Sequence, residues 1–213
     1  IAHAALSNYV HFASHTYAVH AGKNGSILHS SIAFDLTITS LYVPLVRGET
    51  VYLMEEDATI EDLADAIVQF PEMQLLKITP SHLKALNTFL DVKALNNFTL
   101  VIGGEDLLTN DIAPWLEAEN IHIYNEYGPT EATVGCIIYR ATHKDLEHHT
   151  VPIGHPIPNT LIYLLDPNLQ PVAPGQIGEI YISGAGLAQG YLKQESLTHE
   201  KFFMNPFQSQ EEE

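Results

Sequence analysis

Apolar residues recur with two alternating spacings up to about residue 135. Short apolar runs, typical of buried strands, occupy residues 27–34, 50–54, 74–79, 99–102 and 121–124. Amphipathic stretches with helical spacing lie before and between these runs, at residues 1–17, 36–46, 60–70, 81–90 and 110–119. Ser81 begins the fourth of these stretches and is expected to cap it. Strands that alternate with helices in this way predict an α/β fold, in which helices flank a largely parallel sheet.

The pattern changes after these elements. Further short apolar runs, at residues 137–139, 161–165 and 179–183, are separated by turns rich in proline and glycine. This spacing predicts β-structure in the form of a meander or partial barrel. We therefore expect an α/β subdomain at residues 1–140, followed by a β-rich subdomain at residues 141–213.

Composition narrows the class of protein. Of the 213 residues, 46% are hydrophobic, enough for a sizeable core, and the net charge is −17. This charge argues against nucleic acid and anionic membranes as partners, because no basic stripe is available to meet phosphates. The single cysteine, Cys136, excludes an internal disulfide and lies in an apolar run, where an inert buried thiol is expected. Without a signal peptide or an apolar run of about 18 residues, the chain is expected in the reducing cytoplasm.

The stretch Tyr124–Gly135 carries the most concentrated candidate chemistry. It follows the buried run at residues 121–124 and combines aromatic, amide, hydroxyl and carboxylate groups around the turn at Gly128-Pro129. Ligands of open α/β sheets bind at the carboxyl ends of the strands, which is where this stretch is expected. Composition alone, however, favours an ordinary polar turn in which Thr130 caps a helix.

Three other strand ends carry unusual residues. Asp35 stands at the start of an apolar helix, where a helix cap is the alternative to a binding role. Lys77 interrupts an apolar strand, where a solvent-facing edge position is the alternative. Gly103-Gly104 precedes Glu105, and two residues without side chains allow a flat ligand to approach the backbone. If one sheet contains all these strands, their ends share one crevice.

Two further motifs are weak. The stretch Gly184–Gly190 resembles a dinucleotide-binding loop, but its third glycine comes one place late and no helix of useful length follows. A glycine-rich turn is the better interpretation. The pair His148-His149 has no cysteine or carboxylate at ligand spacing, so a solvated loop is expected there and not a metal site.

Taken together, the motifs resemble a known family. The stretch Asn125–Glu131 (NEYGPTE) resembles the fifth core motif of adenylation domains of non-ribosomal peptide synthetases, which belong to the AMP-binding, adenylate-forming superfamily. Gly178–Leu192 resembles their sixth motif, and Phe34-Asp35 with the following helix resembles the fourth. The resemblance implies an internal fragment of the large N-terminal domain of such an enzyme. The phosphate loop is expected before Ile1 and the catalytic lysine in an absent small C-terminal domain, so the fragment alone is expected to be inactive.

The resemblance also implies a reaction and its site. An amino-acid carboxylate attacks the α-phosphate of MgATP, and the aminoacyl group of the resulting adenylate passes to the phosphopantetheine thiol of a carrier protein. Glu131 is then expected to hold Mg²⁺ and Thr130 to contact phosphate, as the catalytic residues. Asn125 is expected to bind the adenine amino group, and Tyr127 to stack adenine against the strand end formed by Gly103, Gly104 and Glu105. The implied partners are the amino acid and the peptidyl carrier and condensation domains of the same synthetase.

The same resemblance places an amino-acid pocket of the asparagine type. Its expected lining is Asp35, Leu36, Thr39, Lys77, Val101, Gly103, Glu126, Val134 and Gly135. Asp35 would pair with the α-ammonium group, since a buried ammonium needs a carboxylate partner.

The chemistry of the pocket agrees with asparagine. Lys77 can donate to the oxygen of a primary amide, and Glu126 can accept from its nitrogen. Aspartate, the second candidate, would bring a carboxylate against Glu126 at a cost of about 1–3 kcal/mol. The alternatives are an acyl-CoA or aryl-acid ligase of the same superfamily, and a binding module without catalysis.

Overall fold

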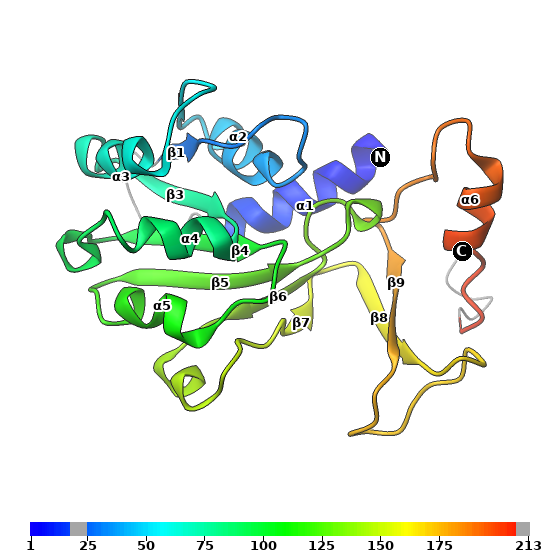
Figure 1. Ribbon diagram of the computed structural model, residues 1–213. Helices are drawn as coiled ribbons and strands as arrows, with labels where there is room; N and C mark the ends of the chain where they lie inside the picture. Colours follow the sequence, from blue (N-terminus) through cyan, green and yellow to red (C-terminus); the bar gives the residue numbers. More distant parts are fainter. Residues whose placement is uncertain (18–24, 208–213) are drawn as a thin grey trace.

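The computed structural model describes residues 1–17 and 25–207, and a seven-stranded sheet is its centre (Figure 1). The strands lie in the order β2-β1-β3-β4-β5-β6-β7; the first five run parallel to one another, whereas β6 is antiparallel to both β5 and β7. The predicted α/β class with a largely parallel sheet is confirmed. The seven strands are β1 (Gly25–Leu28), β2 (Thr50–Leu53), β3 (Met73–Ile78), β4 (Phe98–Gly103), β5 (Ile121–Tyr127), β6 (Ile137–Arg140) and β7 (His155–Pro156).

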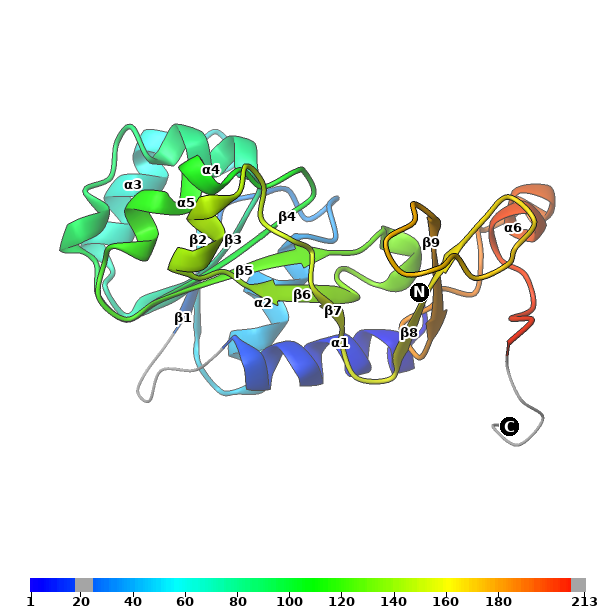
Figure 2. The same cartoon turned by 90° about the horizontal axis from the view of Figure 1, so that it is seen from below.

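Helices cover both faces of this sheet. Figure 2 shows α1 and α2 on one face and α3, α4 and α5 on the other. The helices are α1 (His3–Thr16), α2 (Thr37–Val46), α3 (Ile60–Gln69), α4 (Pro80–Leu86), α5 (Thr109–Leu116) and α6 (Glu195–Lys201), with short 3₁₀ turns η1 (Val92–Ala94), η2 (Thr130–Ala132) and η3 (His143–Glu147). The two layers bury separate apolar clusters, so β3 and β4 are buried on both faces and are almost continuously apolar.

Local sequence signals explain where several helices begin. The α3 helix begins with a capping box, in which the Thr59 side chain accepts from the backbone N–H of Asp62 and the Asp62 carboxylate accepts from Thr59. The α4 helix has Thr79 as its N-cap and Pro80 in its first turn. The prediction of Ser81 as the cap is wrong, because its backbone N–H and hydroxyl donate instead to the Glu105 carboxylate.

Two predicted elements are shorter in the structure. The strand expected at residues 27–34 is β1, which begins at Gly25 and ends at Leu28. Turns occupy the residues between β1 and α2, so Asp35 lies in an irregular segment just before that helix. The helix expected at residues 81–90 ends at Leu86, and the residues that follow form i→i+3 backbone hydrogen bonds typical of turns.

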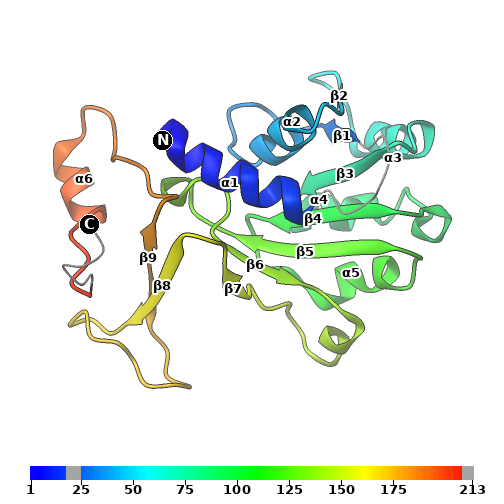
Figure 3. The same cartoon turned by 180° about the vertical axis from the view of Figure 1, so that it is seen from behind.

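The chain beyond β7 forms a smaller layer. Strands β8 (Thr160–Leu165) and β9 (Glu179–Gly184) make a two-stranded antiparallel sheet, followed by α6. Figure 3 shows this part beside the large sheet, next to the start of α1. A subdomain boundary at residue 140 stays a prediction. Across residues 1–17 and 25–207, each helix is too short or too polar to cross a lipid bilayer.

Candidate active site

The register of the central strands gathers the predicted pocket residues on one face of the sheet. Lys77 on β3 lies opposite Val101 on β4, and Gly103 on β4 lies opposite Glu126 on β5. Because side chains alternate along a strand, these residues share the face that α1 and α2 cover. Val101 packs there with Tyr124, its partner on β5, in one buried cluster.

Lys77 and Glu126 form a buried ion pair. The Nζ of Lys77 contacts Oε2 of Glu126, and the two side chains are only 3% and 1% exposed. Lys77 reaches across β4 to do so, and a Cβ atom at Gly103 would lie 3.5 Å from its Nζ. The alternative of a solvent-facing lysine is therefore wrong, because β3 lies inside the sheet between β1 and β4.

Two tyrosines of the α1 segment complete the surroundings of Glu126. The Tyr17 hydroxyl donates to Oε1 at 2.5 Å, and the Tyr9 hydroxyl donates to the same oxygen at 3.0 Å. Tyr9 also lies 2.5 Å from the Thr39 hydroxyl of α2. Burial, followed by the charge of Glu126, raises the pKa of both phenols well above the usual value, so both remain donors.

Sequence reasoning missed both tyrosines. The amphipathic pattern presents Tyr9 as one apolar position of a helix and Tyr17 as the residue where that helix ends. The available signal was their spacing of eight residues, because a buried phenol needs a hydrogen-bond partner. The partner is more than a hundred positions away in the chain, so spacing alone could not identify it.

Asp35 offers an unsatisfied acceptor. Its Oδ2 is buried and, in the part of the chain that the structure describes, accepts no hydrogen bond. The helix-cap alternative is wrong, since Leu36 occupies the N-cap position of α2 and no side chain caps that helix. A buried carboxylate oxygen without a donor is costly and marks a place where a ligand donor fits.

The loop after β5 is strained and closely packed. Thr133 and Val134 have φ angles of 59° and 69°, in the left-handed region that β-branched residues rarely adopt. A Cβ atom at Gly135 would lie 2.3 Å from the Glu126 Cδ, so glycine is needed for the carboxylate to occupy this position. Thr130 begins the η2 turn with Pro129 at the N-cap position, and no side chain caps it. The expectation of Thr130 as a helix cap is therefore wrong.

Residues 184–190, here called the glycine-rich loop, pack against this strained loop. The Ala188 N–H donates to the Glu131 carbonyl at 2.7 Å, and the Thr133 hydroxyl donates to the Gly186 carbonyl at 2.7 Å. The Tyr191 hydroxyl donates to Oε1 of the Glu131 carboxylate. The loop is thus a glycine-rich turn that joins the smaller sheet to the strand end of β5.

The residues predicted for the nucleotide lie partly on the opposite face. The buried Asn125 amide donates through Nδ2 to the carbonyls of Val151 and Pro152, at 3.1 and 3.0 Å. Gly104 is exposed with a φ of 94°, and an added Cβ would meet only a methyl group, 3.9 Å away. Tyr127 is half-buried, and its pKa is raised by burial first and by Cys136 second. A ligand can therefore approach the backbone at the end of β4.

Glu131 has the chemistry of a magnesium ligand. Carboxylate oxygens are the donors that Mg²⁺ prefers, and the bond from Tyr191 engages only Oε1. No cation pairs with this carboxylate among the described residues, and the hydroxyl-bearing Thr130 beside it is exposed. A hollow of about 450 Å³ borders Pro129, Glu131 and the β8–β9 sheet. These residues fit a metal-bound phosphate, although three or more metal-ligating side chains do not cluster anywhere in the described ranges.

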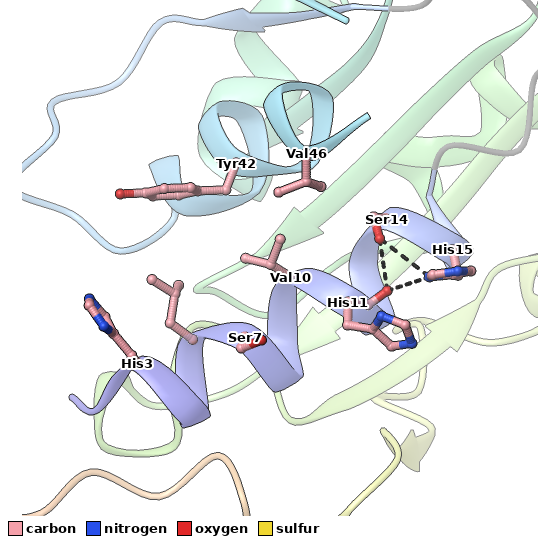
Figure 4. A pocket seen from close by; sticks show the side chains of 9 residues that line it. His3, Ser7, Val10, His11, Ser14, His15, Tyr42 and Val46 are labelled. Carbon is pink, nitrogen blue, oxygen red and sulfur yellow. Dashed lines mark hydrogen bonds between the residues drawn. The ribbon is translucent and has the colours of Figure 1, made fainter. Parts of the chain in front are cut away.

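A second hollow lies on the outer side of α1. Figure 4 shows this groove between α1 and α2, lined by His3, Val10, His11, Tyr42 and others. None of the predicted pocket residues lines it. The α1 helix therefore has two roles, because its Tyr9 side faces Glu126 while its histidine side faces the groove.

The single cysteine is a buried thiol. Cys136 is buried, and burial, with the Glu126 charge as a smaller cause, raises the pKa of its thiol to about 12. The histidines at 148 and 149 are both exposed, and neither belongs to a metal-ligating group in the described ranges.

Comparisons with known proteins agree with these motifs. The family model described as AMP-binding enzyme matches residues 1–192. Tyrocidine synthase 3 of Brevibacillus parabrevis is 40% identical over 97% of this chain, and bacitracin synthase 3 of Bacillus licheniformis is 41% identical over 95% of it. The chain spans only 3% of each of these relatives.

Solved structures share the fold. A four-domain non-ribosomal peptide synthetase bound to AMP and glycine superposes with a TM-score of 0.83 and 28% identity, covering 95% of this chain and 15% of that one. The N-terminal subdomain of Klebsiella oxytoca NpsA, in complex with 3-hydroxybenzoyl-AMSN, gives a TM-score of 0.80 at 23% identity, covering 98% of this chain and 53% of that one.

Proposed function

Since the chain belongs to the AMP-binding enzyme family, we propose that it forms the amino-acid-selecting part of an adenylation domain. The protein that carries it would activate an amino acid with ATP, asparagine first and aspartate second, for non-ribosomal peptide synthesis. The amino-acid carboxylate would attack the α-phosphorus of ATP, with pyrophosphate leaving, and the aminoacyl group would then pass to a carrier-bound phosphopantetheine thiol. Such a reaction joins anions, so positioning and charge stabilisation dominate its catalysis.

The observation that carries this proposal is the buried, unpaired Oδ2 of Asp35. An α-ammonium group would supply the donor that this oxygen lacks. The substrates of acyl-CoA and aryl-acid ligases have no such group and would leave the oxygen unsatisfied. The same oxygen therefore favours an amino acid over both alternatives from the superfamily.

The choice of asparagine rests on the Lys77–Glu126 pair. The two side chains contact directly, and a primary amide can bridge them because it offers an acceptor to Lys77 and donors to Glu126. Thr39 is buried, and its hydroxyl lies 2.5 Å from that of Tyr9, which in turn contacts Glu126. Thr39 can therefore add a hydrogen bond to the substrate. The positive and negative charges offset each other, so a neutral side chain suits the site better than a carboxylate.

Residues at and after the end of β5 would bind ATP and Mg²⁺, which the reaction needs whatever the amino acid. Glu131 would hold Mg²⁺, which neutralises phosphate charge when bound, and Thr130 would contact phosphate. Asn125 and Tyr127 would hold adenine near the exposed backbone of Gly104 and Glu105. The peptidyl carrier and condensation domains of a synthetase would be the partners.

Amino-acid-dependent exchange of pyrophosphate into ATP tests the function in the longest natural protein that contains this sequence. We expect asparagine to support the fastest exchange and aspartate the next. The substrate assignment fails if another amino acid exceeds asparagine by about tenfold, a difference of about 1.4 kcal/mol. A protein that binds asparagine and ATP without exchange would be the non-catalytic module.

A substitution at Glu126 tests the pocket itself. Glu126→His removes the carboxylate that repels a second carboxylate, so the use of aspartate relative to asparagine is expected to rise. Glu117→His on the surface is the matched control, because its pair with Lys93 is largely exposed. An unchanged ratio in Glu126→His would show that this carboxylate does not face the substrate side chain.

A further inference from the structure

The α1 segment places two hydroxyl groups on one oxygen of Glu126. Tyr9 and Tyr17 are eight residues apart, a little more than two helical turns, and so lie on the same face with Ala13 between them. All three side chains are buried. Neither tyrosine lies in the three motifs that resemble the family, at residues 34–35 with the following helix, 125–131 and 178–192.

The two oxygens of the Glu126 carboxylate have different principal donors, and Tyr9 is shared unequally between them. Oε1 accepts from Tyr17 at 2.5 Å and from Tyr9 at 3.0 Å, which uses both of its lone pairs. Oε2 accepts from Lys77 and, at 3.3 Å, takes a longer share of the Tyr9 hydroxyl. The acceptor capacity that remains is therefore on Oε2, beside the Lys77 ammonium.

We propose that Tyr9 and Tyr17 are positioning residues for amino-acid selection, because they occupy Oε1 and direct the free acceptor site of Oε2 toward the side-chain amide of the substrate. This inference rests on the proposed function. The amide nitrogen of the substrate then donates to Oε2 while its amide oxygen accepts from Lys77. One primary amide, such as that of asparagine, supplies both atoms. A carboxylate substrate would present only acceptors to the fixed Oε2.

The type of donor matters as much as its position. Phenols hold the carboxylate without adding charge, so the Lys77–Glu126 pair stays neutral as a unit. A cationic donor in place of either tyrosine would make the pocket positive and favour aspartate. The Tyr17 ring is further fixed by edge contact with Phe12 and by packing on Tyr124, at centroid distances of 5.8 and 5.1 Å.

Removal of each hydroxyl with retention of the ring tests the inference. In the full protein that carries the chain, kcat/KM for asparagine and for aspartate would be measured by pyrophosphate exchange in Tyr9→Phe and Tyr17→Phe. We expect the asparagine-to-aspartate ratio to fall about fivefold in Tyr17→Phe and about threefold in Tyr9→Phe, because a freed carboxylate turns away from the amide. Tyr42→Phe, at a tyrosine of α2 that is 36% exposed, should leave the ratio unchanged.

A purely structural role would lower the rate for both amino acids and leave their ratio unchanged, and that result would overturn the inference. A second measurement isolates the route through Glu126. In a Glu126→Gln background, Tyr17→Phe should cause no further change in the ratio, whereas an undiminished effect would show that the tyrosine acts elsewhere. If Tyr17→Phe does not fold, Tyr9→Phe, which keeps the Tyr17 bond, decides the question.

The wild-type protein separates this inference from the proposed function. If it prefers an amino acid other than asparagine, the substrate assignment fails. The effect of Tyr9→Phe and Tyr17→Phe is then measured on a different ratio of kcat/KM values, that between the preferred amino acid and an analogue whose side chain differs from it by one charge. An unchanged ratio there overturns the positioning role as well.

Discussion

Replacement of Lys77 by methionine would leave the Glu126 carboxylate buried without its cation. The side chains of the pair are 3% and 1% exposed, so water cannot replace the lost partner. Breaking a buried pair from one side costs about 3–5 kcal/mol. The donors Tyr9 and Tyr17 remain, and a hydrogen bond to a charged group contributes about 1.5–3 kcal/mol. We therefore expect the lower end, a loss of about 3 kcal/mol in the free energy of unfolding.

Urea unfolding of the chain, followed by fluorescence of its single, fully buried tryptophan, Trp115, measures this loss. In a thermal experiment it corresponds to a fall of about 6–12 °C in Tm for a domain of this size. The double variant Lys77→Met/Glu126→Gln removes the stranded charge and should recover about 2 kcal/mol.

A surface pair in the same chain is the matched control. Lys93 lies 3.0 Å from Glu117, but the two side chains are 70% and 59% exposed. Lys93→Met should cost less than about 1 kcal/mol. If Lys77→Met costs no more than Lys93→Met, the buried pair contributes nothing special and the reasoning is refuted.

Three further predictions concern the surroundings of the site. Gly135→Ala places a Cβ 2.3 Å from the Glu126 Cδ and so displaces the carboxylate; amino-acid-dependent exchange should fall by about 100-fold. Gly48→Ala meets nothing within 4 Å but is strained at a φ of 71°, so it should lower stability without abolishing exchange. Burial raises the pKa of the Cys136 thiol from 9.0 to about 12, so the free energy of unfolding should fall as the pH rises through this interval. Urea unfolding at about pH 8 and at about pH 10.5 measures this fall, which should be smaller in Cys136→Ala than in the wild-type chain. Thr133→Val removes a 2.7 Å hydrogen bond to the glycine-rich loop; limited proteolysis of that loop should become about fivefold faster, and an unchanged rate would show that the bond does not hold it.

The fold was largely predictable, because the alternation of apolar spacings identifies each central strand and helix. The spacing of apolar residues alone could not show that Lys77 is buried, although the family resemblance placed it in the pocket. A lysine in an apolar strand is usually an edge residue, and only the position of β3 between two other strands, with a glycine opposite its path, shows that it is buried. Local chemistry misled at α4 for a similar reason, since Ser81 has a long-range partner in Glu105 and leaves the cap to Thr79.

The residues of the candidate site that lie in or near sequence motifs were predictable, whereas those that reach the site only through tertiary packing were not. Asp35, Lys77, Gly103, Glu126 and Gly135 were all selected from the sequence, and the register of β3, β4 and β5 brings the middle three together. The tyrosines of α1 were not, because a helix that packs on a sheet shows only that a face is buried, not which atom lies beneath it.

Successive residues of β5 point in opposite directions, which has a consequence for how such a protein can diversify. Asn125 turns to the face occupied by the backbone of residues 151–152, and Glu126 turns to the face beneath α1. Asn125 and Glu126 therefore direct the group proposed for adenine and the group proposed for the amino-acid side chain to opposite faces of β5, whereas the reacting carboxylate and phosphate would meet at the strand end. Substitutions beneath α1 can therefore change the amino-acid substrate in related proteins while the residues proposed to bind the nucleotide stay the same. An insertion or deletion of one residue within β5 would exchange the two faces and abolish both.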